Sequence, residues 1–231
     1  MRNNTMTAVV TGASRGLGLA LTRELSRRGW RIVADARDGG RLDQAVTGLA
    51  GVTPIAGDIA DPAHRSQLAH AVRDGVDLLV NNASVLGPSP QPRLADYPLD
   101  VLEQVYAVNT IAPLALIQAL LPAVRARHGR IIDISSDAAV EPYEGWGGYG
   151  SSKAALDQLT AILGAEEPRI RVYACDPGDM NTDLHQQAFP GEDISDRPAP
   201  ETVVPALLRL IDGDLPSGRY RAAEMGAQVR A

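Results

Sequence analysis

The chain has 231 residues, of which 45% are hydrophobic and 22% charged, and it carries a net charge of −6. The isoelectric point near 5.2 argues against a nucleic-acid or anionic-membrane partner, because both bind basic surfaces. The length suits one α/β domain over residues 1–231. The single cysteine, Cys175, excludes an internal disulfide, and the first ten residues lack the apolar core of a signal peptide. We therefore expect a soluble, cytoplasmic protein.

Short apolar runs alternate with stretches of helical periodicity along the chain. The predicted strands cover, in order, residues 7–11, 31–35, 52–58, 76–84, 130–136, 169–178 and 217–223. The predicted helices cover residues 19–29, 42–50, 62–75, 101–128, 150–164 and 201–212. This alternation predicts a Rossmann-like, doubly wound α/β fold, with a mainly parallel seven-stranded sheet and helices on both faces.

Two segments depart from this rhythm. The helix over 101–128 contains the apolar run Ile111–Val124, which is short for a membrane span and carries two prolines. We expect this helix to break between residues 109 and 113. Residues 183–200 form one long irregular segment, and such a loop inside a compact domain is more often functional than accidental.

A glycine-rich turn follows the first predicted strand. The sequence TGASRGLG places Gly12, Gly16 and Gly18 between that strand and the first helix. Glycine at these positions permits a tight turn and lets a pyrophosphate approach the backbone at the helix amino terminus. No Lys-Ser/Thr pair follows the last glycine, so the turn is not a Walker A loop. The turn predicts a dinucleotide site, and a plain strand-to-helix connection is the alternative.

The end of the second predicted strand indicates which cofactor ribose is held. An acidic residue there would bind the 2′-hydroxyl of NAD, whereas an arginine favours the 2′-phosphate of NADP. The sequence VADARD offers both Asp35 and Arg37. We expect only one of the two side chains to face the cofactor, and these residues alone leave the choice open.

The chain has one lysine, Lys153, against 21 arginines. It follows Tyr149 by four residues, and positions i and i+4 share one face of a helix. Lysine is a compact point charge on a flexible stem, while arginine is a rigid fork, so the two are not interchangeable. The position of this lysine therefore indicates a specific chemical role.

These motifs together resemble the short-chain dehydrogenase/reductase family, in its compact single-domain form, from the glycine turn almost to the carboxyl terminus. TGASRGLG resembles the family's cofactor turn, GDIAD its adenine-side motif, and NNAS its NNAG motif, with Ser84 replacing glycine. Ser136, Tyr149 and Lys153 match its Ser…Tyr-xxx-Lys signature, with 13 positions from serine to tyrosine. Asn109 stands at the family's mid-helix asparagine, and DPGDMNTDL resembles its PG-x-(V/I)-x-T segment, with methionine replacing Val or Ile.

The resemblance implies a complete site without a metal. The implied catalytic residues are Asn109, Ser136, Tyr149 and Lys153. The implied cofactor-binding residues are Gly12, Ser14, Arg15, Gly16, Leu17, Gly18, Arg37, Asp58, Ile59, Asn82, Ala83, Tyr149, Lys153, Pro177, Gly178, Met180 and Thr182. Counting 18 residues on from Gly18 reaches Ala36, where NAD-preferring members carry the acid. Arg37 and Arg15 then resemble the NADP-preferring arrangement, so we expect NADP(H) over NAD(H), with Asp35 pointing away.

The implied reaction is NADP(H)-dependent reduction of a carbonyl, or oxidation of the alcohol. Tyr149 would be the general acid/base, and Ser136 would hold the substrate carbonyl. Lys153 would lower the pKa of Tyr149 and donate to the nicotinamide ribose, while Asn109 would anchor a water that leads to solvent. Purely local roles are the alternatives for two of them: a strand-end hydroxyl for Ser136 and a helix break for Asn109.

Residues 183–200 correspond to the family's substrate lid. This segment is acidic, with Arg197 as its only Lys or Arg, which disfavours a coenzyme A thioester or acyl-carrier substrate. We expect a small-to-medium carbonyl compound, with Trp146 and Phe189 either lining the mouth or packing beside it. The apolar run Ile111–Val124 and the helix that holds the lysine resemble the family's dimer face, so a homodimer or homotetramer is expected.

The remaining polar residues suggest no second site. The histidines show no metal-ligand spacing and are predicted to be surface residues: His64, His70, His128 and His185. Glu141 and Asp157 are predicted to be solvated or to lie at the rim of the site. Two other classes of function stay open, a catalytically silent NADP-binding regulator on the same scaffold and an NAD-dependent epimerase or dehydratase.

Overall fold

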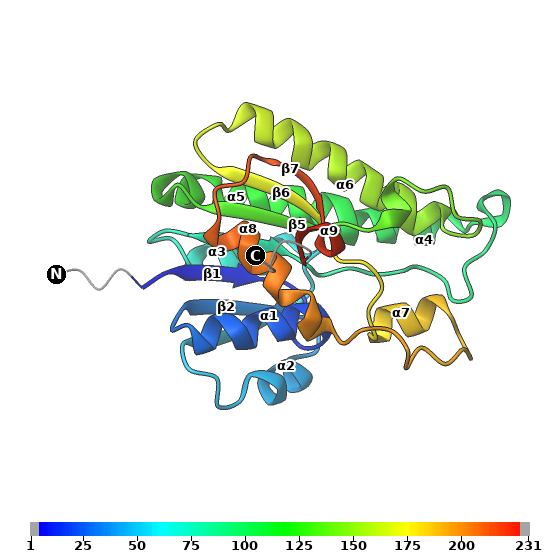
Figure 1. The fold of residues 1–231 in the computed structure, drawn as a ribbon, viewed down its shortest axis with the longest axis horizontal. Coiled ribbons are helices and arrows are strands. Elements are labelled where there is room, and N and C mark those ends of the chain that lie inside the picture. Colours follow the sequence, from blue (N-terminus) through cyan, green and yellow to red (C-terminus); the bar gives the residue numbers. More distant parts are fainter. Residues whose placement is uncertain (1–4, 227–231) are drawn as a thin grey trace.

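Seven parallel strands form one sheet, which confirms the predicted Rossmann-like α/β fold (Figure 1). The computed structural model describes residues 5–226. The strands are β1 (Thr7–Val10), β2 (Arg31–Ala36), β3 (Val52–Ala56), β4 (Leu78–Asn81), β5 (Arg130–Ile134), β6 (Arg171–Asp176) and β7 (Gly218–Arg221). Their order is β3-β2-β1-β4-β5-β6-β7, and every neighbouring pair is parallel.

Helices cover both faces of the sheet because successive strand residues point to opposite sides. The helices are α1 (Gly16–Arg27), α2 (Gly39–Val46), α3 (Pro62–Ala71), α4 (Leu99–Tyr106), α5 (Ala112–Arg127), α6 (Gly147–Glu166), α7 (Asp183–Ala188), α8 (Val204–Asp212) and α9 (Ala222–Gly226). Ala8 and Val10 of β1 pack in one buried cluster with apolar residues of α1, α2 and α8. Val9, between them, packs in a second cluster with apolar residues of α3 and α5.

The strand order reverses between β1 and β4, near the middle of the sheet. The connections that leave the carboxyl ends of these two strands diverge and open a crevice, the usual ligand site of such sheets. Thr11 follows β1, and its hydroxyl accepts hydrogen bonds from the backbone N–H groups of Asn82 and Ala83, both at 3.0 Å. These bonds fix the turn after β1 against the turn after β4, at the floor of the crevice.

The predicted break in the 101–128 helix is a π-helical turn, Ala107–Ile111, between α4 and α5. A π-turn inserts one extra residue without ending the helix. Pro113 lies in the first turn of α5. The chain therefore stays helical where the prolines suggested an interruption, and the predicted break is a change of phase.

The continuous helix from Leu99 to Arg127 has 29 residues and a mean hydropathy of 1.7 in its most apolar window. By length and composition alone it could cross a membrane, but 44% of that window is buried inside the molecule. Leu116, Leu120 and Val124 of α5 are at most 1% exposed and pack in the second cluster. Packing against the sheet accounts for the apolar character of this face.

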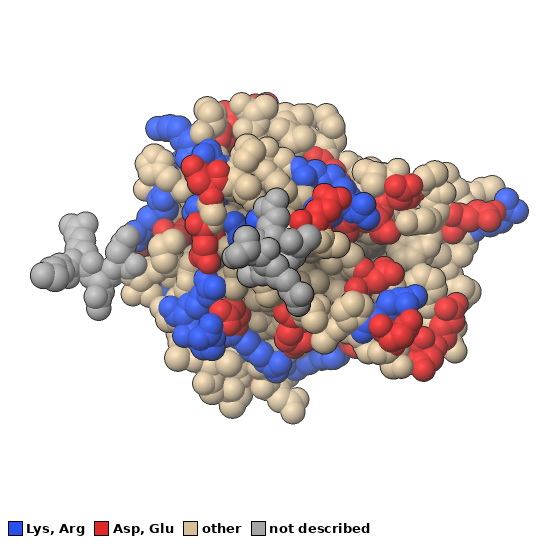
Figure 2. Space-filling view, viewed as in Figure 1, with Lys and Arg blue, Asp and Glu red and all other residues tan. Residues whose placement is uncertain are grey.

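The segment predicted to be irregular, 183–200, begins with a helix, so that part of the prediction is wrong. Thr182 caps α7, because its Oγ1 accepts the backbone N–H of His185 at 3.2 Å. The remainder runs over the surface, and Figure 2 shows acidic side chains gathered there. The exposed acids of this stretch are Glu192, Asp193 and Asp196.

Candidate active site

A pocket of about 440 Å³ opens at the carboxyl ends of the strands, over the crevice. The predicted cofactor residues that line it are Gly12, Ser14, Arg15, Gly16, Leu17, Arg37, Asp58, Ile59, Asn82, Ala83, Pro177, Gly178, Met180 and Thr182. The predicted catalytic residues that line it are Ser136, Tyr149 and Lys153. Gly18 and Asn109 are buried behind its wall. The structure thus brings the two predicted sets to one space, while their chemical roles stay predictions.

The glycine turn forms one wall of the pocket. Gly12 and Gly16 have φ angles of 67° and 54°, conformations that favour glycine. Gly18 lacks a side chain for another reason, since a Cβ there would lie 2.5 Å from the carbonyl oxygen of Gly12. Asn82 holds the turn from across the crevice, because its Nδ2 donates to the carbonyl oxygens of Thr11 (2.9 Å) and Gly12 (3.2 Å). Open backbone at the amino terminus of α1 fits a dinucleotide pyrophosphate.

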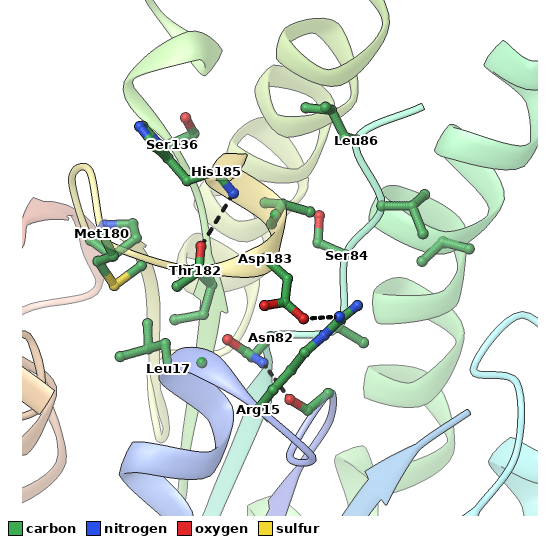
Figure 3. A pocket seen from close by; sticks show the side chains of 18 of the residues that line it. Arg15, Leu17, Asn82, Ser84, Leu86, Ser136, Met180, Thr182, Asp183 and His185 are labelled. Carbon is green, nitrogen blue, oxygen red and sulfur yellow. Dashed lines mark hydrogen bonds and ion pairs between the residues drawn. The ribbon is translucent and has the colours of Figure 1, made fainter. Parts of the chain in front are cut away.

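Three arginines line the end of the pocket near β2 and α2. Arg15 precedes α1, Arg37 follows β2, and Arg41 lies in α2. Sequence reasoning missed Arg41, although it stands four residues after Arg37 on the turn that opens α2. Arg15 and Arg41 both pair with Asp183 of α7, and Figure 3 shows the Arg15 pair across the pocket. Positive charge therefore collects where a phosphate group could bind.

Asp35 and Arg37 both line the pocket, but Arg37 is exposed there whereas Asp35 is buried. Which of the two contacts the cofactor stays a prediction. Asp35 is 1% exposed, and its Oδ1 lies 2.5 Å from Nε2 of His64. His64 is buried, which contradicts its predicted surface position, and Gly57 makes room for it, since a Cβ there would lie 2.2 Å from the imidazole. Burial raises the pKa of Asp35, and the hydrogen bond with His64 only partly offsets this.

Tyr149 and Lys153 are buried side chains on α6. Lys153 Nζ lies 5.6 Å from the centre of the Tyr149 ring and donates to the carbonyl oxygen of Ile134 at 2.7 Å. Burial raises the pKa of Tyr149 above its usual value near 10, while hydrogen bonds with Ser84 and Ser136 act to lower it. Burial also lowers the pKa of Lys153 to about 8. The phenol is thus buried beside two hydroxyls and one ammonium group, and the negative charges of Asp137 and Asp176 also act to raise its pKa.

Asn109 stands in the π-turn, and protein groups engage its whole side chain. Its Oδ1 accepts the backbone N–H of Val85 at 2.9 Å and the Ser84 hydroxyl at 3.1 Å. Its Nδ2 donates to the Val85 carbonyl at 2.9 Å and to Ser152 Oγ at 3.0 Å. Ser84, which the sequence showed only as a departure from glycine, therefore links Asn109 to the surroundings of Tyr149. The water-anchoring role of Asn109 stays a prediction.

Ser136 follows β5 and is fixed by local and distant contacts. Its Oγ accepts the backbone N–H of Ala138 at 3.2 Å and donates to Asp137 Oδ1 at 3.0 Å. Arg219 of β7 donates to the Ser136 carbonyl at 2.9 Å and to Asp157 Oδ2 at 2.9 Å. The side chain of Asp157 is only 13% exposed and pairs with Arg219, so it is not solvated, while its alternative placement at the rim stays a prediction.

A fully buried carboxylate, Asp133, lies on β5 beneath this cluster. Asn81 Nδ2 and Thr160 Oγ1 each donate to it at 2.7 Å. Burial raises the pKa of Asp133 to about 6, against the effect of these two bonds. The negative charge of Asp133 in turn raises the pKa of Lys153. The acid in the apolar run RIIDI was the only signal in the sequence, and its partners come from distant segments.

The Asp133→Asn variant is expected to lower the pKa of Lys153 further below about 8, because the substitution removes the largest charge that supports its ammonium form. The family resemblance implies that carbonyl reduction needs this ammonium, so activity is then expected to be lost as pH rises through the pKa of Lys153. The alkaline limb of the kcat–pH profile should therefore move to lower pH by roughly one unit. An alkaline limb that stays at the wild-type pH would show that Asp133 does not influence the protonation of Lys153.

Aromatic side chains border the pocket beside Tyr149. The rings of Trp146 and Tyr149 lie 5.8 Å apart, and Trp146 lines the pocket. Phe189 packs on Trp146 at 6.1 Å and on His185 at 4.8 Å. Of the two alternatives left open for these aromatics, lining applies to Trp146 and packing to Phe189. Leu184 of α7 belongs to the same apolar group.

Comparison with known proteins defines the class of this site. The chain matches the short chain dehydrogenase family over residues 6–193. It is 35% identical over 199 residues to the sepiapterin reductase of Mus musculus, with 78% of this chain and 76% of that protein covered. It is 34% identical over 199 residues to the 1-deoxy-11-beta-hydroxypentalenate dehydrogenase of Streptomyces arenae, with 80% and 70% covered.

A solved structure shows the same architecture. A short chain dehydrogenase from Shigella flexneri 2a, complexed with NADP, superposes with a TM-score of 0.86 at 26% identity, covering 95% of this chain and 98% of that one. The chain therefore belongs to the short chain dehydrogenase family of oxidoreductases.

Proposed function

We propose that the chain is an NADP(H)-dependent oxidoreductase that reduces the carbonyl group of a small-to-medium substrate or oxidises the corresponding alcohol. The observation that carries this proposal is the convergence of Ser136, Tyr149 and Lys153 on the pocket that the glycine turn also lines. A cofactor cradle and an acid–base group thus open on the same space. The relatives named above include a reductase and a dehydrogenase, which supports chemistry in either direction.

Each residue at the reacting end has a distinct task in this proposal. The bound nicotinamide cofactor would supply or accept the hydride. The Tyr149 hydroxyl gives its proton to the substrate oxygen in reduction and takes it back in oxidation. Ser136 Oγ, which bonds to the adjacent Asp137 carboxylate, turns to donate to that same oxygen. Lys153 holds the cofactor ribose, and its charge favours the phenolate against the effect of burial.

The arginine cluster supports NADP(H) as the preferred cofactor. Arg15, Arg37 and Arg41 line one end of the pocket, and guanidinium groups bind phosphate oxygens through paired hydrogen bonds. The Shigella flexneri relative holds NADP, which agrees with this preference. A 2′-phosphate is the group that distinguishes NADP from NAD. Residues that follow the second strand of such folds contact the 2′ position, and in this chain they lie at the arginine-lined end of the pocket.

Reversing the charge at residue 37 should change the cofactor preference. The Arg37→Asp variant is expected to weaken NADPH binding at least about tenfold, because the carboxylate repels the 2′-phosphate, and to leave NADH binding unchanged or tighter. Fluorescence titration of both cofactors measures this. Arg31→Asp is the matched control, since Arg31 is exposed at the opposite end of β2. An unchanged NADPH/NADH preference in Arg37→Asp would contradict the NADP assignment.

Turnover on a panel of aldehydes and ketones with NADPH tests the reaction itself. NADPH oxidation that depends on one of these carbonyls is the expected result. Cofactor binding without turnover on any of them would favour the silent regulator, for which an acid–base pair has no use. NAD that stays bound through purification would favour an epimerase or dehydratase.

We propose further that the chain acts in the cytoplasm as a homodimer or homotetramer. Large apolar side chains are exposed along the long helix and α6: Leu99 at 72%, Ile111 at 55% and Ile162 at 44%. Burial of such a face between two copies would remove it from water. Light scattering at micromolar concentration should give at least twice the mass of one chain, and a stable monomer would contradict the proposal.

A further inference from the structure

An aspartate from the lid helix sits among the arginines of the cofactor pocket. Oδ2 of Asp183 accepts hydrogen bonds from Nη1 of Arg15 and, at 3.1 Å, from Nη2 of Arg41. All three residues line the pocket, and Figure 3 shows Asp183 and Arg15 pointing toward each other across it. The contacts join α7 to the first two helices over sequence separations of 168 and 142 residues. One carboxylate oxygen is thus shared between two guanidinium groups.

Two guanidinium groups around one oxygen form an anion site, because each presents a fork of N–H donors that matches carboxylate and phosphate oxygens. Asp183 fills this site with a single charge. Partial burial acts to raise the pKa of Asp183, but hydrogen bonds and charge from Arg15 and Arg41 hold it below its usual value. The group is therefore ionised at neutral pH and bound to both cations.

These ion pairs can be displaced. The side chains of Arg15, Asp183 and Arg41 are 45%, 49% and 47% exposed, and ion pairs at such exposure contribute little to stability. A phosphate monoester carries nearly twice the charge of a carboxylate and has three acceptor oxygens. It would therefore replace the carboxylate at the same two guanidinium groups.

We infer that Asp183 is a specificity-determining residue, an internal competitor that a ligand's 2′-phosphate must displace from Arg15 and Arg41. This rests on the proposed preference for NADP(H), which it deepens. The competition lowers the affinity for phosphate-bearing ligands and leaves ligands without that phosphate unaffected. Displacement also frees α7, whose Leu184, His185 and Ala188 line the same pocket. The arrival of the phosphate is thereby coupled to the position of the lid.

The test compares ligands with and without the 2′-phosphate in the full-length chain. Asp183→Asn keeps the size of the side chain and removes its charge. It should tighten NADPH and adenosine 2′-monophosphate about three- to fivefold, and leave NADH and adenosine 5′-monophosphate unchanged. Asp196→Asn is the matched control, because it removes the same charge from an exposed position on the same segment. Fluorescence titration and calorimetry give the four dissociation constants.

Three outcomes would overturn the inference: no change for any ligand, an equal change for ligands with and without the phosphate, or the same change in Asp196→Asn. Should Asp183→Asn fail to fold, Arg41→Gln is the second variant. It should weaken adenosine 2′-monophosphate and spare adenosine 5′-monophosphate, and an equal effect on both would also overturn the inference. The cofactor proposal fails separately, through Arg37→Asp, because the monophosphate pair reports on Asp183 whichever dinucleotide the wild type prefers.

Discussion

Tyr149→Phe is expected to lower carbonyl turnover at least about 10²-fold, because the variant removes the only hydroxyl proposed to exchange a proton with the substrate oxygen. The dissociation constant for NADPH should stay within about twofold of wild type, since the ring remains and only the hydroxyl is lost. Steady-state kinetics and fluorescence titration on the same preparation measure the two effects.

Tyr143→Phe is the matched control for this experiment. Tyr143 lies six residues earlier, is 47% exposed, and does not line the pocket. Its hydroxyl donates to Oδ2 of Asp137, whose Oδ1 accepts from Ser136. It should retain turnover. Retained activity in Tyr149→Phe would remove Tyr149 from the proposed reaction, and a matching loss in both variants would indicate a general effect of losing a tyrosine hydroxyl here.

Lys153→Arg is expected to lose activity to about the same extent as Lys153→Met, roughly 10²-fold, although only the arginine keeps the charge. Lys153 is 2% exposed, and its Nζ donates to the Ile134 carbonyl at 2.7 Å, so a larger planar guanidinium has no matching space. In the proposed reaction a compact ammonium reaches both the phenol and the ribose, which the guanidinium would not.

The pair of lysine variants separates charge from geometry. Measurement of kcat, NADPH affinity and the midpoint of thermal unfolding shows whether the arginine folds and binds yet fails to react. Near-normal turnover in Lys153→Arg would mean that any buried positive charge suffices. The lysine would then be an accident of composition in a chain that otherwise uses arginine.

The sheet and the position of its crevice could be predicted because they depend on local patterns. Apolar runs alternate with helical periodicity, and the glycine turn marks the end of the first strand. The family resemblance supplied most of the predicted lining residues, and they meet in one pocket because the carboxyl ends of parallel strands lie at one edge of a sheet. These features are written in segments of about ten residues.

What the sequence did not reveal depends on contacts between distant segments. The bond between His64 and Asp35 forms because α3 packs over β2 where Gly57 leaves space. No residue spacing within either segment predicts this bond. Asp183 and Arg41 are 142 positions apart in the sequence, and only the fold brings them into contact. Asp157 was predicted to be a solvated or rim residue, and its partner Arg219 comes from the distant strand β7. Charged residues in particular take their roles from partners that only the fold assembles.

The π-turn between α4 and α5 gives one helix two rotational settings. Each residue advances an α-helix by about 100°, so the extra residue turns everything after it by about that angle relative to everything before it. The π-turn Ala107–Ile111 thus directs Asn109 to Ser84 and Ser152 beside the pocket. The helix α5 that follows directs its apolar residues to the sheet. A substitution that is tolerated in the π-turn therefore does not predict which substitutions α5 tolerates, although both segments belong to the same unbroken helix.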